Sequence, residues 1–181
     1  MIMKTVKRES FNKEENGEWV LTKTWTLCYT PISFDEVDQV SEDIRKILKP
    51  NLLSPQYKEG NKTNPLFGHC YHSTQAMYIM LEGEEKENLV PYSGTDALEN
   101  IHWWLNHNGT IIDVTAGQYD LMECDPPYDV GKPTKWYGWR NRLHKRSMGL
   151  VQDVQGGKLE CVDPDGNVIS IRKPLPITLE V

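Results

Sequence analysis

A cysteine near the middle of the chain stands where a helix is expected to begin. The segment Gly68-His69-Cys70-Tyr71-His72-Ser73-Thr74 follows an irregular stretch and opens a helix-like run over residues 71–81. The free N–H groups and the dipole of a helix N-terminus stabilise a thiolate, and they can hold an oxyanion formed during acyl transfer. Cys70 is therefore a candidate nucleophile, although a free cysteine is also commonly a small buried core residue.

A histidine and an aspartate lie on two adjacent predicted strands. His102 stands in the strand expected over residues 100–105, and Asp113 stands in the strand expected over residues 110–115. A loop over residues 106–109 would place the two residues directly opposite each other, whereas a two-residue turn at Asn108-Gly109 would place them diagonally. Both registers put the two side chains on one face of the sheet, within reach of a hydrogen bond when directly opposite. The pair is either part of a catalytic site or a structural ion pair.

Cys70, His102 and Asp113 together form a candidate thiol–imidazole–carboxylate triad. In such a triad the imidazole takes the thiol proton, and the carboxylate fixes the tautomer of the ring. Asn64, six residues before Cys70, is a candidate side-chain donor to the oxyanion, in competition with Asn61 and with the backbone N–H of Cys70.

The same residues admit a metal-binding interpretation. His69, Cys70, His72 and His102 carry the imidazole and thiolate groups that suit zinc. However, His69 and His72 are three residues apart with Cys70 between them, which matches no familiar zinc motif. We therefore expect neither a metal nor a cofactor here.

The order of these residues resembles that of the papain-like and transglutaminase-like cysteine hydrolases, in which a cysteine caps a helix and a histidine and an aspartate lie on neighbouring strands. A closer resemblance is to small YunG-like proteins of bacteria and their phages. It covers roughly residues 64–150 and includes Lys145-Arg146, whereas the first 50 residues and the final hairpin have no clear counterpart. The runs that carry it are Gly68-His69-Cys70-Tyr71, His102-Trp103-Trp104, and Asp113-Val114-Thr115 with Gln118-Tyr119.

The resemblance implies a role for each residue of the triad. Cys70 would be the nucleophile, His102 the base and Asp113 the residue that orients the base. Asn64 and Gln118 are the candidates for oxyanion or supporting roles. The resemblance suggests no particular substrate, so it bears on the site more than on the function.

The composition excludes several classes of protein. A chain of 181 residues with 38% hydrophobic and 25% charged residues fits one domain, neither disordered nor membrane-spanning. The start Met1-Ile2-Met3-Lys4 lacks the apolar region of a secretory signal, and the four cysteines lie far apart. These features predict a cytoplasmic protein with reduced thiols.

The charge is unevenly distributed. The net charge is -6, yet residues 132–146 carry six basic residues and no acidic one. An acidic body argues against general nucleic-acid binding. The basic segment is either the solvated face of a helix or a site for a carboxylate or phosphate of a substrate or partner. The candidates for such anion binding are Arg140, Arg142, Lys145 and Arg146.

The pattern of apolar residues predicts an α+β fold. Helices are expected over residues 34–48, 71–81 and 140–154, with hairpins at Asn16-Gly17, Asn108-Gly109 and Asp165-Gly166. Residues 51–69 are expected to be irregular, and residues 82–87 to form an acidic linker. We expect one domain over residues 1–181 in which an antiparallel sheet packs against the cysteine-bearing helix in a papain-like architecture. Residues 64–150 would form its core, with hairpin and helix additions over residues 1–50 and 158–181.

The function expected from these features is that of a cysteine-dependent hydrolase or acyl transferase. It would act on an amide or thioester-type carbonyl of an unknown protein or small-molecule substrate, away from membranes. The alternative is a non-catalytic binding or host-interaction protein that retains the hydrolase fold, because fold does not determine function.

Overall fold

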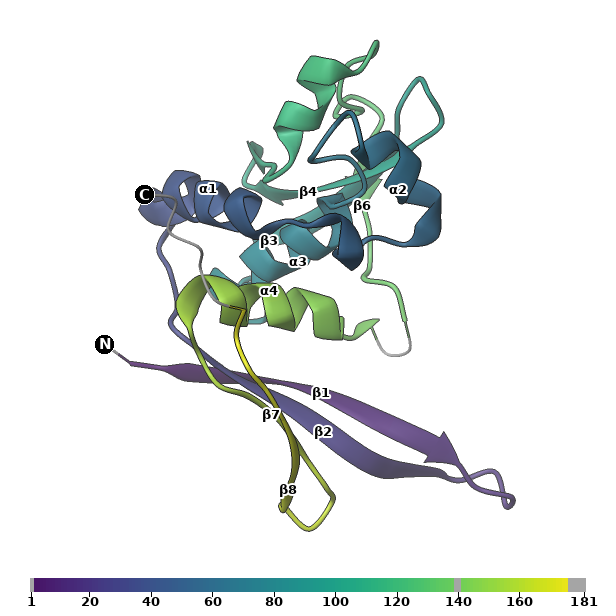
Figure 1. The fold of residues 1–181 in the computed structure, drawn as a ribbon, viewed down its shortest axis with the longest axis vertical. Helices are drawn as coiled ribbons and strands as arrows, with labels where there is room; N and C mark the ends of the chain where they lie inside the picture. Colours follow the sequence, from purple (N-terminus) through teal and green to yellow (C-terminus); the bar gives the residue numbers. More distant parts are fainter. Residues whose placement is uncertain (1, 139–140, 176–181) are drawn as a thin grey trace.

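Two antiparallel sheets of four strands each organise the part of the chain that the computed structural model describes, residues 2–138 and 141–175 (Figure 1). The first sheet has the order β1-β2-β7-β8, and the second has the order β5-β4-β3-β6. Helices lie between the sheets, so the fold is α+β as the sequence predicts. A second sheet was not expected, because the strand β3 and the short strand β6 carry no clear hairpin signal.

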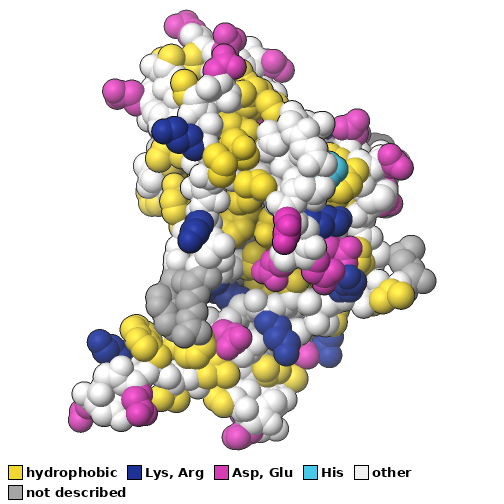
Figure 2. All heavy atoms as spheres, turned by 180° about the vertical axis from the view of Figure 1, so that it is seen from behind, with side chains coloured by type: hydrophobic (Ala, Val, Ile, Leu, Met, Phe, Trp, Pro, Cys, Tyr) yellow, Lys and Arg dark blue, Asp and Glu magenta, His cyan; other side chains and the backbone are white. Residues whose placement is uncertain are grey.

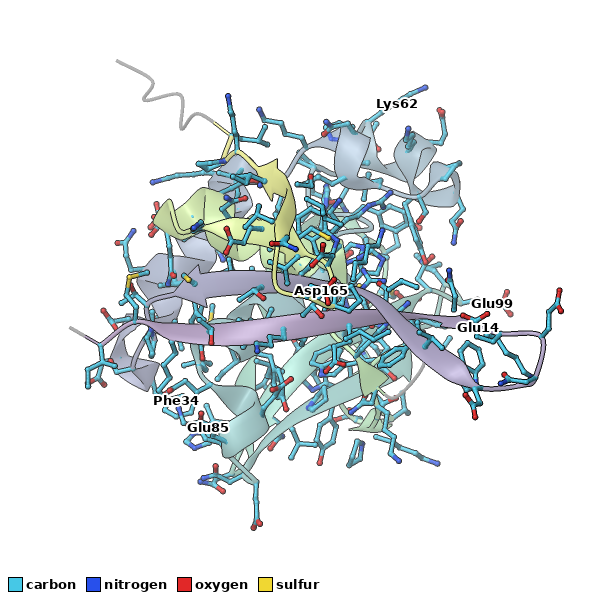
Figure 3. The ribbon with its side chains drawn as sticks, turned by 90° about the horizontal axis from the view of Figure 1, so that it is seen from below. Glu14, Phe34, Lys62, Glu85, Glu99 and Asp165 are labelled. Carbon is cyan, nitrogen blue, oxygen red and sulfur yellow. The ribbon has the colours of Figure 1, made fainter. Side chains whose placement is uncertain are left out.

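The first sheet joins the two ends of the chain. Its strands are β1 (Lys4–Lys13), β2 (Trp19–Tyr29), β7 (Leu159–Val162) and β8 (Val168–Arg172). The β1–β2 hairpin turns at Asn16-Gly17 as predicted, with Gly17 at φ 87°. Seen from below, the two long strands run across the molecule in front of the helices, with Glu14 near their turn (Figure 3).

Helices α3 (Cys70–Met80) and α4 (Lys145–Gln155) pack against each other between the sheets. Helix α4 contacts β2 and β7, whereas α3 contacts β4, so the two helices form the inner layers of the fold (Figure 1). Helix α3 is buried on nearly all sides, since it is covered by α4 on one side and by the second sheet on the other. Its fully buried Met77 and Met80 belong to the core that α4 and the first sheet complete.

Two further α-helices and several short 3-10 turns belong to the described residues. The amphipathic helix α1 (Val37–Ile47) follows the 3-10 turn η1 (Phe34–Glu36), as the periodicity predicts, and packs on α3 and α4. The segment expected to be irregular contains a short helix, α2 (Pro55–Asn61), which begins with a proline in its first turn. None of the helices in the described ranges is long and apolar enough to cross a membrane.

The second sheet carries the predicted histidine strand. Its strands are β3 (Leu89–Thr95), β4 (Ile101–His107), β5 (Thr110–Ile112) and β6 (Lys132–Pro133). Asn108 and Gly109 both have positive φ angles, which is typical of a tight two-residue hairpin turn. The register pairs Leu105 with Ile112. The four-residue loop considered as one alternative is therefore wrong, and Asp113 lies just beyond β5, diagonal to His102.

The last predicted helix begins later than expected. Asn141 has a φ angle of 54° and Gly138 one of 99°, and neither conformation continues an α-helix. Helix α4 begins only at Lys145, where the His144 side chain accepts a hydrogen bond from the Arg146 N–H and caps the helix. Arg140 lies outside the described residues.

Candidate active site

Cys70 is the first residue of α3, at the position that the sequence predicts. The N–H groups of the first helical turn have no acceptor within the helix, so they are available to an anion near the thiol. Cys70 is 8% exposed, and its Sγ atom lies 3.8 Å from the carbonyl oxygen of Ile101 at the start of β4. The nucleophile candidate thus lies where a helix N-terminus meets the beginning of a strand.

The loop before Cys70 is held by local hydrogen bonds. The Asn61 side-chain amide donates to the carbonyl oxygens of Pro65 and Phe67, each at 3.0 Å. Gly68 has a φ angle of 86°, and a Cβ atom there would lie 2.6 Å from the Cβ atom of Tyr57. Asn61 is therefore occupied in shaping the loop, and glycine is required at the turn that brings Cys70 to the helix start.

His102 and Asp113 are joined by a short hydrogen bond. His102 Nε2 lies 2.6 Å from Asp113 Oδ2, and the side chains are only 1% and 2% exposed. The other carboxylate oxygen, Oδ1, accepts the backbone N–H of Thr115 at 3.1 Å. A buried ion pair that keeps additional hydrogen bonds satisfies the condition under which burial of charge is tolerated.

Two aromatic rings enclose the imidazole. Trp104 stacks on His102 with ring centroids 5.8 Å apart, and Tyr119 meets its ring at a right angle at 5.0 Å. The Tyr119 hydroxyl donates in turn to the buried carboxylate of Asp96 at 2.9 Å. These contacts restrict the orientation of the imidazole ring.

The protonation of His102 depends on both of its acidic neighbours. Burial lowers the pKa of His102, but hydrogen bonds to Asp113 and Cys70, together with the negative charges of these groups, raise the pKa to about 9. Because Nε2 is bonded to Asp113, Nδ1 is the nitrogen left to exchange a proton with the thiol. Thiol, imidazole and carboxylate therefore form one continuous chain of interactions.

Gln118 lies at that second nitrogen. Its side-chain amide is 2.8 Å from His102 Nδ1, and its backbone carbonyl accepts a hydrogen bond from Asn64 Nδ2 at 2.9 Å. A neutral imidazole accepts from the amide NH₂ group, whereas an imidazolium donates to the amide oxygen, so the two protonation states call for opposite orientations of this amide. The structure thus brings Asn64 and Gln118 to the site, with Asn64 holding the segment that carries Gln118.

Tyr128 is a further contact of the site that the sequence did not indicate. Its hydroxyl donates to Asp113 Oδ2 at 2.7 Å. The residue lies in a proline-rich loop, fifteen positions after Asp113, where neither periodicity nor a motif connects it to the triad.

Three basic side chains of the segment, those of Arg142, Lys145 and Arg146, contact the protein itself. Arg142 donates to the carbonyl oxygen of Glu9 at 3.0 Å, and Arg146 donates to that of Leu52 at 2.8 Å. Lys145 lies over the ring of Trp25, 4.1 Å from its centroid. These contacts tie the start of α4 to the first sheet and to the loop before α2. Binding of an anionic group by this segment stays a prediction.

A second group of histidines lies along α3 and the start of α4. His72 lies 3.4 Å from the hydroxyl of Ser147, and its ring centroid is 4.6 Å from that of His144. Burial lowers the pKa of His69 to about 4, and burial together with the nearby positive charges of His144 and Arg146 lowers that of His72 to about 3. Within the described ranges, no cluster of three or more His, Cys, Asp or Glu side chains is arranged to hold a metal ion.

We expect these histidines to make the fold sensitive to acid. Because the folded pKa values lie below the ~6.5 of an unfolded histidine, the unfolded state binds more protons between pH 6.5 and 4, and stability falls as the pH falls through this window. The loss from His69 and His72 together should be on the order of 6 kcal/mol at pH 4. His102 does not contribute to this loss, because its raised pKa stabilises the folded state fully at every pH below 6.5.

Urea unfolding over a pH series measures this loss. His72→Gln should flatten the decline between pH 6.5 and 4 relative to the unaltered protein, because it removes the group with the lowest pKa. A decline of the same slope in this variant would contradict the assignment.

Comparisons with protein-family models, with curated proteins and with solved structures give no match for this chain. The site combines a thiol at a helix N-terminus, an imidazole in contact with it, and a buried carboxylate on the far nitrogen of the ring. This arrangement is suited to nucleophilic attack by sulfur with proton transfer through the ring.

Proposed function

We propose that this protein is a cysteine-dependent hydrolase or acyl transferase with a papain-like arrangement of its site. The proposal depends chiefly on one observation, the interaction of the His102 imidazole with both Cys70 and Asp113. In this proposal Cys70 is the nucleophile, His102 the general base and acid, and Asp113 the group that orients the ring.

The proposed reaction proceeds in two steps. In the first, the Cys70 thiolate attacks the carbonyl carbon of an amide or thioester, and the His102 imidazolium gives its proton to the leaving amine or thiol. The product is a thioester on Cys70 and a neutral imidazole. In the second step, His102 takes a proton from water or an acceptor amine as the oxygen or nitrogen attacks the thioester. The acyl group leaves as an acid or a new amide. Cys70 returns to a thiolate and His102 to an imidazolium.

The oxyanion of each step would form beside the start of α3. The free N–H groups of the first turn are suitable donors, and the Gln118 amide is a suitable side-chain donor once it turns from His102 Nδ1 toward the substrate. Asn64 supports this role indirectly, because it holds the backbone of Gln118.

One observation favours the alternative of a non-catalytic binding protein that retains this arrangement. Cys70 is mostly buried, and His102 and Gln118 are almost entirely buried, so a substrate carbonyl needs local movement to reach the thiol. A protein that uses the pair of His102 and Asp113 only to stabilise its fold would need no such access.

A stopped-flow experiment with p-nitrophenyl acetate tests the proposal. An active thiol gives a burst of about one nitrophenolate per chain as the acyl-enzyme forms. We expect this burst from the unaltered protein and from Cys124→Ala, and its loss in Cys70→Ala. A burst that survives in Cys70→Ala, or its absence from the unaltered protein, would favour the binding protein.

A further inference from the structure

Tyr128 and His102 bind the same carboxylate oxygen. The Tyr128 hydroxyl donates to Asp113 Oδ2 at 2.7 Å, and His102 Nε2 lies 2.6 Å from that atom. The Tyr128 ring meets the edge of Trp104 at 5.1 Å, and Trp104 stacks on His102. Tyr128 thus contacts both the carboxylate and the aromatic wall of the imidazole.

Tyr128 and Asp113 also border one open groove. This groove has a volume of about 460 Å³ and lies between α1 and the segment that follows β5. Asp113 and Tyr128 both line it, yet the Asp113 side chain is only 2% exposed. The carboxylate is therefore covered at the floor of a groove that is large enough to hold water. The α1 side of the groove consists of Val37, Asp38, Ser41, Glu42 and Arg45.

The loop that carries Tyr128 is anchored at both sides. The Tyr128 N–H donates to the carbonyl oxygen of Pro126 at 2.9 Å, and the short strand β6 that follows pairs with β3. Gly131 lies directly against the Trp104 ring, where no Cβ atom would fit. The backbone thus brings Tyr128 to Asp113 as part of the second sheet, rather than as the tip of a free loop.

We propose that Tyr128 is a positioning residue of the triad, whose hydroxyl holds Asp113 Oδ2 toward His102 and whose ring keeps water in the groove from that oxygen. The inference of a catalytic consequence rests on the proposed function, whereas the effect on His102 does not. Asp113 would then be oriented from both oxygens, by Thr115 N–H at Oδ1 and by Tyr128 at Oδ2.

The hydroxyl should influence His102 through the shared oxygen. The titratable groups that face the imidazole are Asp113, Cys70 and Tyr119, and Tyr128 reaches it only through Asp113. Removal of the hydroxyl takes one donor from the carboxylate, whose negative charge then acts more fully on the imidazolium. The pKa of His102 should therefore rise when the hydroxyl is lost.

The first test compares Tyr128→Phe with the unaltered protein. Phenylalanine keeps the ring on Trp104 and removes only the donor. NMR titration of His102 should show its midpoint raised by roughly half a pH unit or more, since a hydrogen bond to a charged group is worth on the order of one unit. Tyr92→Phe is the matched control, because the Tyr92 ring also lies on Trp104, at 6.1 Å, and its variant should leave the His102 midpoint unchanged.

A second variant changes the hydroxyl without removing it. Tyr128→3-fluorotyrosine keeps the shape and makes the phenol a stronger donor, so it should shift the His102 midpoint downward, opposite to phenylalanine. His102 midpoints that are the same in both variants and the unaltered protein would overturn the proposal.

Kinetic measurement separates this inference from the proposed function. Acylation by p-nitrophenyl acetate should slow about tenfold in Tyr128→Phe, because Asp113 is held less accurately. Shifted His102 midpoints in a protein that gives no burst would refute the proposed function and leave the positioning of Asp113 supported. A normal burst with unchanged His102 midpoints would support the proposed function and overturn the positioning role of Tyr128.

Discussion

Replacement of Asp113 by asparagine is expected to lower the rate of Cys70 acylation by about ten-thousandfold and to leave the fold intact. Asparagine has nearly the shape of aspartate but no charge, and its amide can turn an NH₂ group toward His102 Nε2. The ring then loses the acceptor that keeps its proton on Nε2 and its free electron pair on Nδ1. Because Nδ1 is the nitrogen left to take the thiol proton, the base is lost with the tautomer.

The same substitution should change the titration of His102. Asp113 raises the pKa of His102 toward 9, so the midpoint should fall in Asp113→Asn. A raised pKa stabilises the folded state below pH 6.5, and this contribution is lost as the pH rises through 9. The free energies of unfolding of the two proteins should therefore converge in alkaline solution, which urea unfolding at pH 6 and pH 10 would measure.

A suitable control is Asp163→Asn, a change in the exposed turn between β7 and β8 that should alter neither the acylation rate nor the His102 midpoint. A loss of less than tenfold in Asp113→Asn, with the fold preserved, would mean that Asp113 is a structural partner of His102 and no part of a triad.

The four cysteines are expected to react with iodoacetamide in an order that their exposure does not explain. Cys28 and Cys124 are more exposed than Cys70, and Cys161 is buried. Accessibility alone would therefore label Cys28 and Cys124 first. We expect Cys70 to react first at mildly acidic pH, because the His102 imidazolium and the helix N-terminus stabilise its thiolate.

His102→Ala provides the test of that reason. It removes the imidazolium and should slow the labelling of Cys70 by about 10- to 100-fold at pH 6, with no effect on the other three cysteines. Peptide mass mapping over a pH series measures all four rates in one experiment. Cys70 would be a structural cysteine if it were labelled after Cys28 and Cys124, or if its labelling rate were the same in His102→Ala as in the unaltered protein.

Exposed apolar side chains on the surface carry no comparable assignment. Leu98, Ile101 and Leu121 are among the large hydrophobic residues that reach the surface, and Figure 2 shows apolar side chains between acidic ones over one face of the molecule.

Local sequence determined several parts of the fold because their causes are local. The turn at Asn108-Gly109 needs residues that accept positive φ angles, and the alternation along β4 and beyond β5 places His102 and Asp113 on one face in either register. The start of α3 at Cys70 follows from the break at Gly68 and the apolar run after it. Local sequence therefore predicts all three residues of the candidate triad.

The failures of prediction were also local in origin. Residues 51–69 contain prolines and glycines that indicate a loop, yet helix α2 forms there because a proline in the first helical turn is favourable. Residues 140–144 have the composition of a helix, but the backbone of Asn141 is in the left-handed region. Helix α4 begins only after His144, whose side chain caps it. Propensity is a weak guide where capping and tertiary contacts decide the boundary.

The other groups that meet the triad depend on contacts between segments that are distant in the sequence. Gln118 reaches His102 Nδ1 because Asn64, from a loop far earlier in the chain, holds its backbone, and Tyr128 reaches Asp113 because β6 pairs with β3 and Gly131 fits against Trp104. These contacts join segments that are distant in the sequence, and the periodicity of apolar residues predicts only contacts a few residues apart. The sequence alone determined which residues could share a face or begin a helix, since backbone geometry repeats over a few residues. The groups that tune them depend on how whole elements pack, which is set by the fold as a unit.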